Sequence, residues 1–132
     1  MHSINYVRVM SIKSYKTQIL IFYILFMFIN SIIPIFSSKE IWKYANFFHF
    51  IEFFILGLLY MNAFFETSLN FKKIKIALVF LTLIPIVDEG LQYFFIIPGR
   101  VADINDIIID LVGGYCGVIL CIFIYKIKEL NG

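Results

Sequence analysis

The chain alternates between four long apolar stretches and short polar segments that are mostly basic. The apolar stretches cover residues 17–36, about 44–65, about 76–97 and about 104–125. Each has about 20 residues, so a helix that rises about 1.5 Å per residue crosses a hydrocarbon core about 30 Å thick. The pattern therefore predicts an all-α membrane protein with four transmembrane helices.

Composition agrees with a membrane protein and argues against a soluble or nucleic-acid-binding protein. Hydrophobic residues make up 61% of the 132 residues and charged residues 15%, against about a quarter in soluble proteins. A soluble chain of this length could not bury so much apolar surface. The basic residues form short clusters beside apolar stretches, which does not support nucleic-acid binding.

The chain is short enough for one domain, and no linker or internal repeat divides it. We expect a cytoplasmic segment at 1–16, a four-helix membrane domain at 17–126 and a cytoplasmic tail at 127–132. The first apolar stretch follows a basic segment, as in a signal peptide. It is too long for one, and no small-residue cleavage site follows it, so it is predicted to remain as the first span.

Lysine and arginine residues indicate how the spans are oriented. The N-terminal segment, the middle loop and the C-terminal segment together carry eight of the 11 lysine and arginine residues. The two loops on the other side of the membrane carry the remaining three, which are Lys39, Lys43 and Arg100. Cytoplasmic segments are enriched in these residues. Both termini are therefore predicted to lie in the cytoplasm of a multi-pass cell-membrane protein.

Ionisable residues also occur inside the apolar stretches. His49 and Glu52 of the second span are three positions apart and share a helix face. Farther along, five of the nine acids fall between positions 88 and 110, accompanied by Gln92 and Arg100: Asp88, Glu89, Asp103, Asp106 and Asp110. Charged groups at membrane depth are costly and usually line a polar interior, so these residues form the candidate functional site.

Counting about 1.5 Å per residue places these groups at similar depths. Asp88 lies about 18 Å above the cytoplasmic start of the third span. His49 and Glu52 lie about 7–12 Å below the outer surface, and Asp110 about 9 Å below it. The i, i+3, i+7 spacing of Asp103, Asp106 and Asp110 predicts one stripe on the fourth span. We therefore expect one acidic site in the outer half of the bilayer.

The six carboxyl groups exceed the one arginine and one histidine beside them, and burial does not tolerate such an excess of charge. Some carboxyls must be protonated or hydrated, or a positive group must join them. The sequence selects neither a metal nor a cofactor, although carboxylate oxygens suit a divalent cation. Cys116 and Cys121 lie on different helix faces and predict neither a disulfide nor a zinc site. Gly113 and Gly117 form a Gly-x-x-x-Gly pattern, which favours close approach of another helix.

Three blocks of sequence carry these polar residues in a specific combined spacing. They are the histidine-led segment 46–54, the segment Asp88-Glu89-Gly90-Leu91-Gln92, and the series from Arg100 through Asp103, Asp106 and Asp110 to Gly113 and Gly117. Over about residues 15–126 the chain resembles the VanZ-like family of integral membrane proteins. The resemblance implies a compact four-helix protein of a Gram-positive type of cell with a role in the cell envelope. In some relatives it implies reduced susceptibility to glycopeptide antibiotics such as teicoplanin.

Three functions are considered for this site. In the first, it binds or modifies a membrane lipid or a lipid-linked envelope precursor from the outer leaflet. Arg100 would hold a phosphate or carboxylate as a forked donor, and His49 with Asp88 or Glu89 would exchange protons. The predicted catalytic residues are His49, Glu52, Asp88, Glu89 and Asp106, and the predicted binding residues are Gln92, Arg100, Asp103 and Asp110. Whether the site is catalytic stays open.

In the second, the polar groups only lock the helices together as a structural network. Arg100 would pair with Glu89 or Asp103, and His49 with Glu52 or Asp88. Transport ranks third, because four spans are few for a carrier and the sequence has no repeat. The sequence sets neither the oligomeric state nor the ligand.

Overall fold

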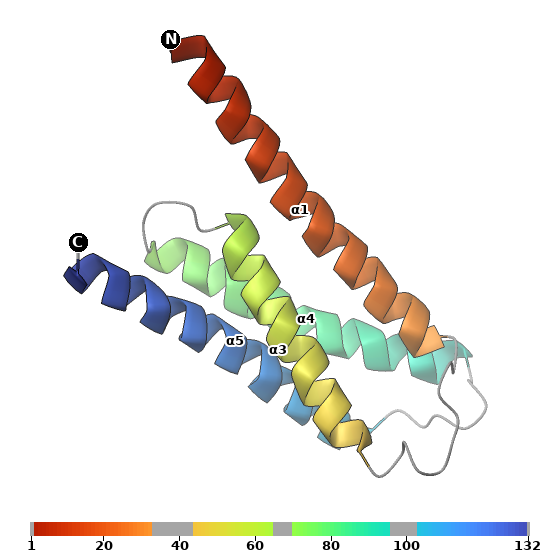
Figure 1. Ribbon diagram of the computed structural model, residues 1–132. Helices are drawn as coiled ribbons and strands as arrows, with labels where there is room; N and C mark the ends of the chain where they lie inside the picture. The colour runs from red at the N-terminus through yellow and green to blue at the C-terminus, as the bar shows by residue number, and fades with distance from the viewer. Residues whose placement is uncertain (1, 33–43, 65–69, 96–102, 132) are drawn as a thin grey trace.

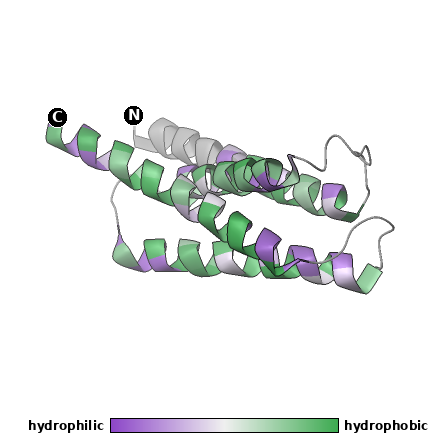
Figure 2. Ribbon diagram, turned by 90° about the horizontal axis from the view of Figure 1, so that it is seen from below, coloured by the Kyte–Doolittle hydropathy of each residue, from purple (hydrophilic) through white to green (hydrophobic). Residues whose placement is uncertain are grey.

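The computed structural model describes residues 2–32, 44–64, 70–95 and 103–131, with side chains from residue 15 onward. Four helices make up this part of the chain: α1 (His2–Ile32), α3 (Ala45–Phe64), α4 (Phe71–Phe95) and α5 (Ile104–Asn131). The prediction of an all-α protein is confirmed for the described residues. Hydrophobic positions cover most of these helices, and hydrophilic positions gather toward their ends (Figure 2).

The helices are longer than the apolar stretches that predicted them. α4 begins at Phe71 rather than near residue 76, because Asn70 caps it. Asn70 Oδ1 accepts the N–H of Lys72 at 2.9 Å, and the Asn70 carbonyl oxygen accepts the N–H of Ile74 at 3.1 Å. α1 already begins at His2, and α5 continues to Asn131. Basic residues such as Lys16, Lys72 and Lys126, which flank the apolar stretches, therefore lie on helices. Lysine is a good helix former.

Three of the four helices contain stretches long and apolar enough to cross a membrane. These are Tyr15–Ile32 within α1, Ala45–Phe64 and Ile104–Asn131. α4 has 25 residues, which gives a length of about 37 Å, but it is not among the three. Its polar residues Asp88, Glu89 and Gln92 are buried. The structure thus supports three of the predicted spans, and a fourth crossing by α4 stays a prediction.

The helices alternate in direction along the chain. Figure 1 shows α1 and α4 running one way and α3 and α5 running back, so the described chain ends lie toward the same end of the bundle. At the opposite end α1 and α4 finish, and α3 and α5 begin. α3 and α5 run parallel and form the most extensive contact between any two of the four helices.

Glycines bring the backbones of α3 and α5 together. A Cβ added to Gly113 would collide with the carbonyl oxygen of Phe50, and one added to Gly117 would collide with the α3 backbone in the same way. Gly57 of α3 makes the reciprocal contact, because its own Cβ would collide with the Gly114 carbonyl oxygen. The close approach predicted from Gly113 and Gly117 is confirmed, and the approaching helix is α3.

An apolar core fills the bundle, and the outer helix faces are apolar as well. Phe53, Leu56 and Leu81 are among the fully buried side chains. Between α4 and α5, the hydroxyl groups of Thr82 and Tyr115 form a hydrogen bond of 2.7 Å. Many large hydrophobic side chains on all four helices are exposed, as expected for surfaces that contact lipid rather than water.

Candidate functional site

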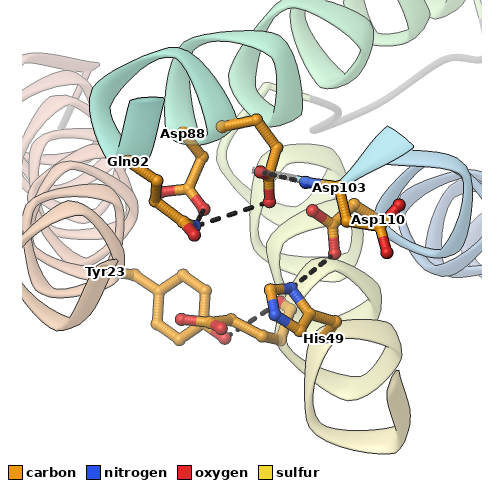
Figure 3. A network of polar contacts seen from close by, with 8 residues as sticks. Tyr23, His49, Asp88, Gln92, Asp103 and Asp110 are labelled. Atoms are coloured by element: carbon orange, nitrogen blue, oxygen red, sulfur yellow. Dashed lines mark hydrogen bonds and ion pairs between the residues drawn. The ribbon is translucent and has the colours of Figure 1, made fainter. Parts of the chain in front are cut away.

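Polar side chains from three helices meet near the end of the bundle that is opposite to the chain ends. His49 is four residues past the start of α3 and Asp110 six past the start of α5, so both lie about 6–9 Å from that end. We call the following group the polar cluster: His49 and Glu52 of α3, Asp88, Glu89 and Gln92 of α4, and Asp106 and Asp110 of α5. Figure 3 shows His49, Asp88, Gln92 and Asp110 pointing toward one another from these three helices.

The closest contact in the polar cluster joins α3 to α5. His49 Nδ1 lies 3.1 Å from Asp110 Oδ1, although the two residues are 61 positions apart in the chain. Asp110 is fully buried, with 0% of its surface exposed. The backbone contact of Gly113 with Phe50 lies one residue from His49 and less than one turn from Asp110. Close helix packing therefore brings these two short side chains within reach.

This pairing corrects the sequence-based prediction, which gave His49 a partner in Glu52 or Asp88. Glu52 shares the His49 face of α3 by its spacing, but the crossing of α5 brings the Asp110 carboxylate nearer. Glu52 remains close enough to His49 to interact electrostatically. Helix spacing identifies residues on one face, whereas the partner on another helix depends on the crossing.

The second oxygen of Asp110 stands apart from this pair. Asp110 Oδ2 is buried, and no hydrogen-bond partner for it lies in the described part of the chain. Buried polar atoms are nearly always hydrogen-bonded to protein or to water. An unsatisfied carboxylate oxygen at the centre of the polar cluster is therefore unusual for a purely structural core.

α4 contributes three buried side chains on one face. Gln92 Nε2 donates to Asp88 Oδ2 at 3.3 Å and to Glu89 Oε1 at 3.5 Å, so one amide lies between two carboxyl groups. Glu89 Oε2 also accepts the backbone N–H of Asp103 at 3.0 Å, which links α4 to the start of α5. The i, i+4 placement expected for Asp88 and Gln92 is confirmed.

Asp103 occupies a different position from the one predicted. Its carboxylate lies just before α5 and caps that helix: Asp103 Oδ1 accepts the Asn105 backbone N–H at 2.9 Å and the Asn105 side-chain amide at 3.0 Å. The predicted stripe of three acids is thus reduced to Asp106 and Asp110. Asp103 still reaches the polar cluster through its backbone N–H, which Glu89 accepts.

α1 adds a tyrosine that the sequence analysis missed. The Tyr23 hydroxyl donates to the backbone carbonyl oxygen of Glu52 at 2.9 Å, and Figure 3 shows its ring beside the polar cluster. The available signal was a hydroxyl in the middle of an apolar span, since a buried tyrosine hydroxyl needs a partner. Tyr23 ties α1 to α3 at the level of the cluster.

Carboxyl groups outnumber basic groups in the polar cluster. Asp106 lies close enough to His49, Glu89 and Asp110 to interact electrostatically. Asp88 has the same relation to Glu89 and Asp110. The cluster therefore holds five carboxyls and a single imidazole. Arg100, the predicted basic partner, lies outside the described residues.

A metal centre is not supported by the geometry. Within the described ranges, no group of three or more His, Cys, Asp and Glu side chains is placed to hold a metal ion. The side chains of the polar cluster can themselves exchange protons, at His49 and the carboxyls, and form hydrogen bonds to positive or polar groups.

Comparison with known proteins relates this cluster to a family. A family model described as VanZ/LLP1 matches residues 1–125, nearly the whole chain. The chain belongs to the VanZ/LLP1 family. The resemblance carried by the three sequence blocks is thus confirmed, and those blocks supply the polar cluster of this VanZ/LLP1 protein. Its family and its three long apolar helices indicate a membrane protein. Comparison with curated proteins and with solved structures finds no match.

Proposed function

We propose that this VanZ/LLP1 protein is a four-span cell-envelope protein whose polar cluster binds or modifies a lipid or lipid-linked envelope precursor. The observation that supports it best is that the part-buried His49 meets the buried carboxyls of Asp110, Asp88 and Glu89 inside a bundle with apolar outer faces. Ionisable groups inside a membrane helix bundle are energetically costly, and residues of this kind usually mark a functional site. By the positive-inside rule, the cluster lies in the outer half of the membrane, where envelope precursors are assembled into the wall.

Within this proposal the residues have distinct roles. With its Nδ1 proton held by Asp110, His49 presents Nε2 as the proton acceptor, in the way that a carboxylate fixes the tautomer of a general base. Asp88 and Glu89 supply further proton-exchanging or ligand-binding oxygens, and Gln92 supplies an amide. Arg100, three positions before Asp103 in the sequence, remains the candidate residue to bind a phosphate or carboxylate group of the ligand.

A structural network is the second candidate, and specific hydrogen bonds favour it. Tyr23 links α1 to α3 through Glu52, and Thr82 links α4 to α5 through Tyr115. Such bonds are worth about 0.6–2 kcal/mol each between membrane helices. On this view the polar cluster holds the helices in place and the protein acts as a membrane interaction partner without chemistry.

A complementation experiment distinguishes the two. Wild type, Asp88→Asn and His49→Gln are expressed in a Gram-positive host that lacks the protein, and teicoplanin susceptibility and envelope composition are measured beside protein level and melting temperature. Glu129→Gln is the matched control, since Glu129 is an exposed carboxylate at the far end of α5. We expect the two site variants to accumulate like wild type but to lose its effect. Loss of protein level in parallel with the effect would support the structural network, and an unchanged effect at wild-type levels would refute the proposal.

A further inference from the structure

One buried oxygen of the polar cluster, Asp110 Oδ2, is free to accept a hydrogen bond from a group other than the described residues. Asp110 Oδ1 is engaged by His49, while Oδ2 is buried without a partner among the described residues. Leaving a buried acceptor unmet is costly, and more so when it is charged. A donor placed against Oδ2 would remove that cost.

The charge of the cluster favours a cationic donor for this oxygen. Five carboxyls surround one imidazole, so even with His49 and Arg100 both charged the full set would keep an excess of three negative charges if every carboxyl were ionised. A neutral or anionic ligand would leave this excess in place. A cationic group would offset it, and the described residues do not form the multidentate arrangement that a metal ion requires.

The position of Gln92 shows what kind of cation fits. Its amide nitrogen lies between Asp88 Oδ2 and Glu89 Oε1, at 3.3 and 3.5 Å, which is long for such bonds. A primary ammonium carries three donors on one small centre and makes shorter, charge-assisted bonds to carboxylates. A quaternary ammonium has no N–H that it could donate to Asp110 Oδ2. The cluster is thus suited to a primary amine that displaces the Gln92 amide.

We propose that the carboxyls around Asp110 bind the primary ammonium group of an amine-bearing envelope lipid or lipid-linked precursor, with Asp110 Oδ2 as a direct acceptor. This inference rests on the proposed function of the same site and narrows its ligand to one chemical class. Two sources carry such a group: the head group of an aminolipid, and an amino-acid side chain on the peptide of a precursor. Because Asp110 is fully buried, the side chains around it must move for the ligand to reach Oδ2.

The test measures binding to the full-length protein in detergent by native mass spectrometry. The probes are phosphatidylethanolamine, its mono-, di- and trimethylated forms and phosphatidylglycerol, together with a lysine-containing tripeptide and its acetylated form. We expect binding to weaken about tenfold or more from the primary to the quaternary amine, since at least one charge-assisted bond is lost. Asp110→Asn, which keeps an acceptor for His49, should weaken binding of the primary amine by a similar factor. Glu129→Gln should leave it unchanged.

Each result has a defined meaning. Selective binding of the lysine peptide over its acetylated form assigns the amine to a precursor peptide, and selective binding of phosphatidylethanolamine assigns it to a lipid. Should Asp110→Asn fail to fold, Asp88→Asn serves as the second variant with the same expected loss. Equal binding of the primary and quaternary lipids overturns the ammonium inference. If phosphatidylglycerol then binds in a manner that depends on Asp110 or Asp88, the proposed lipid-binding function survives; if no probe binds in that manner, the proposed function fails as well.

Discussion

The contact between His49 and Asp110 affects both the stability of the bundle and the proton chemistry open to the polar cluster. It joins two helices at a fully buried carboxylate, so either residue alone would be left with an unmet polar group. In a buried pair, the cost of removing one partner arises mainly from the group that stays behind. The pair is therefore expected to behave as a unit.

Replacement of Asp110 by alanine is expected to lower the free energy of unfolding by about 1–3 kcal/mol, because His49 Nδ1 loses its acceptor. Alanine at both positions should cost less than the sum of the two single changes, since it removes both polar groups together. Unfolding in mixed detergent, followed by circular dichroism, measures these values. Glu129→Ala serves as the control. Strict additivity of the single changes would show that the contact contributes no coupling energy.

Several individual site residues could be predicted from the sequence, but their partners could not. An ionisable residue inside an apolar span is visible in the sequence itself, and His49, Asp88 and Asp110 are of this kind. Their partners depend on where another helix crosses, and no local spacing contains that information. Asp103 is the reverse case, because an acid immediately before a helical stretch is a local capping signal. The same acid also fits the i, i+3, i+7 spacing of Asp106 and Asp110, so the sequence pattern alone does not distinguish a cap from a stripe.

The pairing of α3 with α5 depends on residues that have no side chain. Gly57, Gly113 and Gly117 remove the volume that would separate the two backbones, and large residues such as Phe53 then pack beside the contact. The polar cluster begins within one turn of it. A change in the spacing of these helices should therefore alter the His49–Asp110 distance as well as the stability.

Alanine at Gly113 or Gly117 should destabilise the protein by about 1–3 kcal/mol, because the added methyl group meets backbone that cannot give way. Two other glycines are matched controls. At Gly114 the nearest atom is a Leu81 side-chain carbon at 3.6 Å, and at Gly90 nothing lies within 4 Å. Alanine there should be neutral, or stabilising by up to about 1 kcal/mol through helix propensity. Chemical unfolding of all four variants tests the pattern, and equal losses at all four would contradict it.

At the scale of elements, the sequence predicted that a helix would approach the glycines but not which one. Gly57 was the missing signal, since an isolated glycine within an apolar helical stretch often marks a close backbone contact. The helix ends were also less predictable than the apolar stretches. Hydropathy reports where a membrane could lie, whereas a helix continues past that level wherever caps and good helix formers allow it, as at Asn70 and along the lysine-rich end of α5.

For the whole molecule, the topology depends on whether α4 crosses the membrane. Its length is sufficient, yet it is not among the three helices found long and apolar enough to cross a membrane, and it carries the buried acids Asp88 and Glu89. In the bundle it runs opposite to α3 and α5, as a fourth crossing would require (Figure 1). Helices that line a polar site are expected to be less apolar than those that mostly face lipid.

Cysteine labelling in intact cells tests this topology, after Cys116 and Cys121 are replaced by alanine. We expect Ser3→Cys and Asn131→Cys to react with an impermeant maleimide only after permeabilisation, and Asn105→Cys to react from outside. Four crossings put both chain ends on one side, whereas three crossings put Ser3 and Asn131 on opposite sides. Asn105 lies at the end of the bundle that holds the polar cluster, so its reactivity also identifies the leaflet. Labelling of Asn105→Cys only from the cytoplasm would turn the cluster inward and remove the basis for a ligand that arrives from the outer leaflet.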